Sequence, residues 1–174
     1  MGAERSRYRA GGKFDQAIAE LIEQRGGGDN SYLIQEMITT ALKLIDERPD
    51  RGELKIINTA LKELRYAFKI FTPYRHLRKV SVFGSARAPK KSPEFHLAKE
   101  FAKKIVRKGY MVITGAASGI MEAANEGAGS QQSFGINIRL PFEQEPNPFI
   151  REDEKLMTFK YFFTRKLIFI KESS

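Results

Sequence analysis

The sequence predicts an α/β protein, with an incomplete parallel sheet of about four strands preceded by an α-helical N-terminal extension. From residue 79 onwards, short β-rich runs alternate with helical stretches, and strands joined by helices pair in parallel. Before residue 73, apolar residues recur only at helical spacing, and each stretch ends at glycine or proline. We therefore expect two parts, a helical extension at 1–73 and the N-terminal part of an α/β domain at 74–174.

The extension is expected to hold three helices. Their ends are marked by a Gly triplet at 26–28, by Pro49 and by Pro73, which places the helices at 14–24, 31–47 and 51–71. The third starts with Asp50 and Glu53, a spacing typical of a capping box. The second and third helices each carry an apolar stripe. Such stripes need a partner, which is either the following domain or another subunit.

The α/β part is expected to follow a regular order. The strands are predicted at 80–83, 110–114, 134–140 and 156–159, and the helices at 93–108, 120–127 and 161–171. A parallel sheet of this kind binds ligands at the carboxyl ends of its strands. The turns that follow the strands are therefore where functional residues are expected.

Composition limits the chemistry. The chain has 174 residues, a net charge of +9 and no cysteine, and its two histidines lie 20 positions apart at His76 and His96. These counts exclude disulfides and thiol nucleophiles, and they favour neither a metal site nor a cofactor. The positive charge favours phosphorylated ligands. Because it is spread evenly along the chain, with no basic arm and no long apolar run, we expect a cytoplasmic protein that binds neither nucleic acid nor membrane.

Two turns join a strand to a helix through small residues. Small residues let backbone N–H groups approach an anion, and the following helix N-terminus adds partial positive charge. Neither turn is a complete dinucleotide or Walker motif, and tight packing explains the glycines equally well. The candidate nucleotide-binding residues of these turns are Gly84, Ser85, Gly115, Ala116, Ala117, Ser118 and Gly119.

Charged residues near the strand ends are further candidates. Arg165 and Lys166 interrupt an apolar-aromatic segment at the start of the last helix, where cations oppose the helix dipole and a bound anion would relieve the repulsion. Both side chains could instead point into solvent. Arg139 carries the same ambiguity. Glu122 could contact a ribose hydroxyl or could simply favour the first turn of its helix.

Four ordered blocks resemble the LONELY GUY nucleotide phosphoribohydrolases, in particular the longer bacterial forms with a helical N-terminal extension. The blocks are VFGSAR at 82–87, ITG at 113–115 with GIMEAAN at 119–125, FGINIRLPFEQ at 134–144 and FKYFFTRK at 159–166. Many such proteins carry the label lysine decarboxylase, but nothing in this sequence resembles a pyridoxal-phosphate lysine site. The resemblance covers about residues 79–174.

The resemblance implies a Rossmann-like dimer that hydrolyses the N-glycosidic bond of a nucleoside 5′-monophosphate such as AMP, giving a base and ribose 5-phosphate. It implies catalytic roles for Arg165 and Lys166, and nucleotide contacts from both turns, Met121, Glu122 and Arg139. The family's second turn is usually richer in glycine, and its P-G-G-x-G-T-x-x-E motif, with the catalytic glutamate, follows the next strand, where this sequence ends at Ser174.

Two functional hypotheses therefore remain. The first is a phosphoribohydrolase-like protein that is inactive as this chain alone, because the catalytic carboxylate comes from elsewhere. It implies a homo-oligomer, or a second chain that completes the sheet. The alternative is a non-catalytic nucleotide-binding or assembly module.

Overall fold

The computed structural model of the protein describes residues 14–141 and 145–174. Residues 1–13 of the expected extension and residues 142–144 of the third sequence block lie outside this range. The described residues form two compact units, which divide between Lys55 and Ile56.

The first unit contains helices α2 (Asp15–Gln24) and α3 (Ser31–Glu47) and the start of α4 (Arg51–Phe71). The expected capping box is present at the start of α4: the Asp50 N–H donates to Glu53 Oε2 and the Glu53 N–H donates to Asp50 Oδ1, both at 2.8 Å. Each bond satisfies a backbone donor that the first helical turn leaves unpaired.

The second unit contains a parallel sheet with the strand order β1-β2-β3-β4. The strands are β1 (Lys79–Val82), β2 (Met111–Thr114), β3 (Ser133–Ile138) and β4 (Leu156–Phe159). β2 and β3 are buried along their whole length, as expected for strands covered on both faces. All four carboxyl ends meet at one edge of the sheet, because every pairing is parallel.

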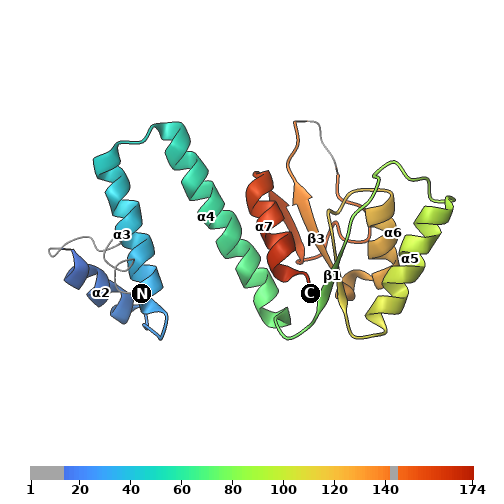
Figure 1. Ribbon diagram of the computed structural model, residues 1–174, viewed down its shortest axis with the longest axis horizontal. Coiled ribbons are helices and arrows are strands. Elements are labelled where there is room, and N and C mark those ends of the chain that lie inside the picture. Colours follow the sequence, from blue (N-terminus) through green and yellow to red (C-terminus); the bar gives the residue numbers. More distant parts are fainter. Residues whose placement is uncertain (1–13, 142–144) are drawn as a thin grey trace. The chain divides into compact units, whose positions relative to one another are not determined.

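Helices cover both faces of the sheet. Figure 1 shows α5 (Pro93–Val106) and α6 (Ile120–Ala128) on one face and α7 (Phe162–Glu172) on the other. Short 3-10 turns follow α4 at Thr72–Tyr74 and precede β3 at Ser130–Gln132. The larger core cluster joins the last turns of α4 to the sheet and α7. Phe71 stacks on Phe134 there, with ring centroids 4.4 Å apart.

The predicted fold class is confirmed, because the unit is an α/β structure with a four-stranded parallel sheet. The third strand ends at Ile138, earlier than predicted, although the Arg139 N–H still donates to the Phe159 carbonyl. Most of the third helix belongs to the sheet-containing unit, since Ala67 and Phe71 are core residues. In the ranges that the structure describes, no helix combines the length and apolarity of a membrane span.

Candidate functional site

The two small-residue turns are locked to each other at the carboxyl edge of the sheet. The Ile120 N–H, at the start of α6, donates to the Ser85 carbonyl at 3.1 Å. Ser118 Oγ donates to the Ala86 carbonyl at 2.8 Å. The turn after β1 is therefore joined to the turn after β2 by these two hydrogen bonds.

Packing explains the glycines at which these turns meet. A Cβ on Gly84 would stand 2.5 Å from Ile120 Cβ, and a Cβ on Gly119 would overlap the Ser85 carbonyl oxygen. Gly119 also has a φ of +67°, a conformation that side chains disfavour. For these two positions, tight packing accounts for the glycine without a ligand.

Gly115 has a different environment, because a cation lies beside it. A Cβ on Gly115 would stand 2.5 Å from Arg165 Nη2 and 2.9 Å from Met121 Sδ. The absence of a side chain on Gly115 makes room for the guanidinium group. The fold brings together Gly115 from the turn after β2, Met121 from α6 and Arg165 from α7.

Arg165 is held in place by the sheet. The last pair of residues between β2 and β3 is Thr114 and Gly135. Ile136 lies one residue beyond the part of β3 that pairs with β2. Arg165 Nε donates to the Ile136 carbonyl at 2.7 Å. The guanidinium carbon also lies 5.2 Å from the ring centroid of Phe169, one helical turn further on. One N–H group of the guanidinium, Nε–H, is thus hydrogen-bonded to the sheet.

The remaining N–H groups of Arg165 have no anionic partner in the described ranges, where no carboxylate lies within 4.0 Å of the guanidinium. Burial lowers the pKa of this half-buried group from its usual value by removing it from water. Arginine remains protonated at neutral pH despite such a shift. A partly desolvated cation with free donors favours an anionic ligand such as phosphate.

The backbone of the second turn is also held by the side chain of Asn147, a residue that the sequence analysis missed. Asn147 Nδ2 lies 3.2 Å from the Ala116 carbonyl, 3.1 Å from the Ala117 carbonyl and 2.9 Å from Asn125 Oδ1, so its two N–H groups are shared among three acceptors. Asn125 Oδ1 also accepts from Thr114 Oγ1 at 2.7 Å. The only sequence signal was an asparagine between two prolines, which indicates a turn but does not reveal the distant contact.

Ala116 adopts a left-handed conformation, with φ +62°, and is fully buried. Its N–H is satisfied by Thr114 Oγ1 at 3.0 Å, and its carbonyl by the Asn147 N–H at 2.8 Å. These bonds hold a backbone shape that alanine disfavours. Ala116 and Ala117 thus shape the turn through their backbones while their side chains are buried.

Three other predicted site residues lie apart from the Gly115–Arg165 contact. Glu122 is buried, and its Oε1 pairs with Lys90 Nζ at 2.7 Å. Arg139 lines a separate groove of about 300 Å³ with Asn137 and Thr158. Lys166 is exposed on α7, so adjacency in sequence does not place it beside Arg165.

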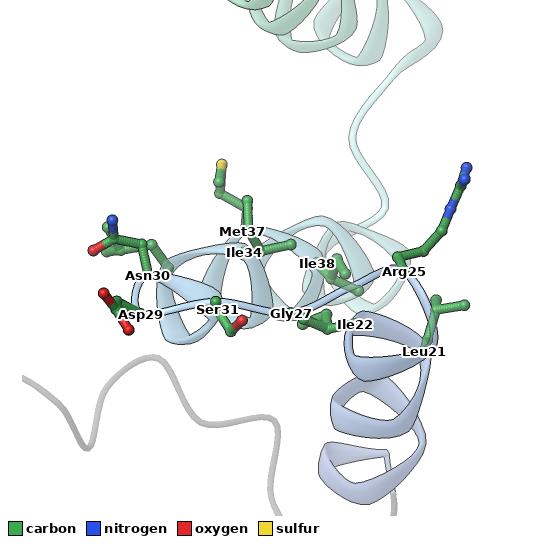
Figure 2. A pocket seen from close by; sticks show the side chains of 12 residues that line it. Leu21, Ile22, Arg25, Gly27, Asp29, Asn30, Ser31, Ile34, Met37 and Ile38 are labelled. Carbon is green, nitrogen blue, oxygen red and sulfur yellow. The ribbon is translucent and has the colours of Figure 1, made fainter.

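The first unit carries a groove of its own, of about 880 Å³, between α2 and α3 (Figure 2). Its walls are mainly aliphatic, including Ile22, Ile34 and Ile38, with Arg25 and Asp29 as its charged members. Among the described residues, no group of three or more histidine or acidic side chains is arranged to hold a metal ion.

Comparisons with known proteins place the chain in a family. No curated protein matches the sequence. The solved X-ray structure of TM1055, a structural genomics target, is similar at 27% identity and a TM-score of 0.39, over 56% of this chain. The chain spans only 57% of the length of that structure.

The family comparison covers the sheet-containing part. The model of the SLOG cluster4 family matches residues 77–173, which is more than half of the chain. This family is related to the LOG-type Rossmann-like proteins, so the sequence resemblance is confirmed at that wider level, while membership of the LONELY GUY family itself stays a prediction. The chain belongs to the SLOG cluster4 family.

Proposed function

We propose that the carboxyl edge of the sheet binds a nucleoside 5′-monophosphate such as AMP, with Arg165 contacting its phosphate beside the second turn. The observation that carries this proposal is the Arg165 guanidinium, anchored through Nε to Ile136 at 2.7 Å and lying against Gly115. The anchoring bond fixes the plane of the fork, so its other N–H groups are preorganised for a phosphate.

The helix that follows the second turn supports an anionic ligand. α6 begins at Ile120, and the early N–H groups of a helix carry partial positive charge. The Ile120 N–H is already bonded to the Ser85 carbonyl, and the Ala123 N–H to the Gly119 carbonyl. The N–H groups of Met121 and Glu122 lie between them in the first turn, which makes them the backbone donors that we assign to the ligand.

The proposed reaction is hydrolysis of the N-glycosidic bond. Water adds to C1′ of the ribose as the bond to the base breaks, its electron pair leaves with the base nitrogen, and a proton is transferred to the base. The products are a free base and ribose 5-phosphate. A positive charge develops on the ribosyl group, and a nearby carboxylate would stabilise it.

Among the described residues, Arg165 is the candidate cation of this mechanism, whereas no carboxylate is assigned to stabilise the ribosyl charge. Glu122, the acidic residue of the second turn's helix, is paired with Lys90. We propose that the carboxylate needed for catalysis comes from another segment or chain. The same observation favours a second candidate function, in which the site binds a nucleotide without turning it over.

The proposal also includes an additional strand that pairs with the outer edge of β1. Among the described residues, β2 is the one strand that pairs with β1, and on the other side of β1 the Lys79 carbonyl accepts the Ser174 N–H at 2.9 Å. Alternate residues of a strand present their backbone groups to the same edge, so Ser81 presents its groups there too. We propose that a strand from a second copy or a second polypeptide pairs with this edge.

An assay of base release, combined with a mass measurement, tests the proposed function. Purified protein is incubated with AMP and adenine is quantified by chromatography, while light scattering reports the assembly state; Arg165→Ala serves as the control. Adenine that appears only when Arg165 is present supports hydrolysis. Binding without adenine release supports the non-catalytic candidate, and the absence of both contradicts the proposed site.

A further inference from the structure

The start of α7 is stabilised by a carboxylate from a distant helix. Glu63 of α4 lies at this helix end: the Lys160 N–H donates to Glu63 Oε1 at 2.5 Å, and Thr164 Oγ1 lies 2.6 Å from Glu63 Oε2. Thr164 Oγ1 is also 2.9 Å from the Tyr161 carbonyl. The single hydroxyl proton serves one of these acceptors at a time, and the charged, closer carboxylate is the stronger.

Glu63 brings a negative charge to a helix start that has no side-chain cap of its own. The residue before the first turn of α7 is Tyr161, whose side chain makes no capping hydrogen bond. A helix N-terminus without a cap leaves unpaired N–H groups and partial positive charge. The cations Arg165 and Lys166 add to that charge, so a carboxylate at this place offsets both. The carboxylate of Glu63 therefore supplies part of the negative charge that the sequence analysis expected from a bound anion near Arg165 and Lys166.

The position of Arg165 depends on where this helix begins. Arg165 follows Thr164 directly, and Thr164 is fully buried. The guanidinium has little freedom, since Nε is 2.7 Å from the Ile136 carbonyl and Nη2 lies against Gly115. A shift of the first turn of α7 by a fraction of an ångström would weaken both contacts, because hydrogen bonds depend steeply on geometry.

We propose that Glu63 is a positioning residue for Arg165, acting through its bonds to Lys160 and Thr164 at the start of α7. The proposal rests on the proposed function, in which Arg165 contacts the phosphate of a nucleotide. It assigns a role to α4: the last helix of the N-terminal segment helps to set the geometry of the anion-binding group at the sheet edge.

Two effects of Glu63 on anion affinity have opposite signs, and this makes the proposal testable. As a nearby negative charge, Glu63 repels a phosphate, so its neutralisation would raise the affinity. As a positioning group, it holds Arg165 in place, so its loss lowers the affinity. The proposal requires the second effect to be the larger.

The experiment compares Glu63→Gln with Glu53→Gln. Both carboxylates accept a backbone N–H near a helix start, but Glu53 bonds Asp50 at the start of α4 in the first unit, and Glu63 bonds Lys160 just before α7. Two quantities are measured: the Kd for AMP by calorimetry, and the hydrogen exchange rate of the Arg165 Nε–H by NMR in the free protein. The second reports the bond to Ile136 directly and needs no ligand.

We expect Glu63→Gln to weaken AMP binding about fivefold, because a less well aligned Arg165 forms weaker hydrogen bonds to the phosphate, and to speed Nε–H exchange. Glu53→Gln should change neither quantity. Thr164→Val, which keeps the volume of a buried side chain and removes one of the two bonds, should act in the same direction and provides the test if Glu63→Gln fails to fold.

An unchanged Nε–H exchange rate in Glu63→Gln and Thr164→Val would overturn the proposal, as would tighter AMP binding by either variant. If the unaltered protein binds no AMP, the proposed function fails, and the exchange rate alone then decides whether Glu63 positions Arg165.

Discussion

The guanidinium of Arg165 lies directly against the backbone of Gly115. A Cβ on Gly115 would stand 2.5 Å from Nη2 of Arg165. Gly115 is not among the glycines with positive φ, so backbone conformation does not demand glycine here. The need for glycine arises from the space that the arginine occupies, which links the second turn to the cation from α7.

Gly115→Ala should therefore impair the site more than the fold. We expect a shift of the Arg165 side chain and a loss of AMP affinity of about tenfold, because a misplaced charged group loses its aligned hydrogen bonds. Calorimetry with AMP measures the change. In an Arg165→Ala background, the same substitution should have no further effect on affinity; an equal effect in both backgrounds would contradict the assigned contact.

Gly119→Ala and Gly109→Ala separate close contact from backbone strain. Both glycines have positive φ, +67° and +83°, but a Cβ on Gly119 would overlap Ser85 whereas Gly109 faces open space. We expect Gly109→Ala to lower the free energy of unfolding by about 1 kcal/mol. Gly119→Ala should cost several times more in urea denaturation. Similar losses in the two variants would show that the turns are not locked together.

The buried Asn147 network should be important for stability. Asn147→Ala removes donors from the Ala116 and Ala117 carbonyls and from Asn125, so we expect the free energy of unfolding to fall by roughly 3 kcal/mol. Asn137→Ala is a matched control, since Asn137 is similarly buried at 6% exposure and makes no side-chain hydrogen bond within the described ranges. Chemical denaturation should show a clearly smaller loss for the control.

Lys79 should make stability depend on alkaline pH. Its ammonium group, 3% exposed, donates to the Tyr74 and Leu77 carbonyls and lies 3.7 Å from Glu172, and burial lowers its pKa below the ordinary 10.5. Between the lowered pKa and 10.5, the unfolded chain binds more protons than the folded one. The free energy of unfolding contributed by Lys79 therefore rises with pH in that window.

The comparison of the unaltered protein with Lys79→Met isolates this contribution. Thermal or urea unfolding at a series of pH values should show the difference in stability shifting in favour of the unaltered protein as the pH approaches 10.5. If the ion pair with Glu172 outweighed burial, the difference would instead shift towards the variant over the same range.

The sequence predicted the elements well because their signals are local. The alternation of strands and helices, the glycines at strand ends and the Asp50–Glu53 box each depend on residues close together in the chain. These signals also placed Arg165 and the second turn at the same edge of the sheet. They could not decide which glycines were needed for packing and which for a neighbouring cation.

The supporting contacts of the site could not be predicted, because they join residues far apart in sequence. Asn147 reaches Ala116 across 31 positions, and Glu63 reaches Thr164 across 101. Arg165 and Lys166 also looked equivalent in sequence. A helix rotates neighbouring residues by about 100°, and this rotation turns one towards the sheet and leaves the other exposed.

Titration with AMP tests the central claim most directly. Calorimetry is performed on the unaltered protein, Arg165→Ala and Lys166→Ala, which remove neighbouring cations of equal charge. The account predicts that Arg165→Ala weakens binding at least about tenfold, as the loss of a charge-assisted bond to phosphate should, while Lys166→Ala stays within about threefold. Equal losses for the two variants, or unchanged affinity in Arg165→Ala, would contradict the assignment of Arg165 as the anion-binding residue.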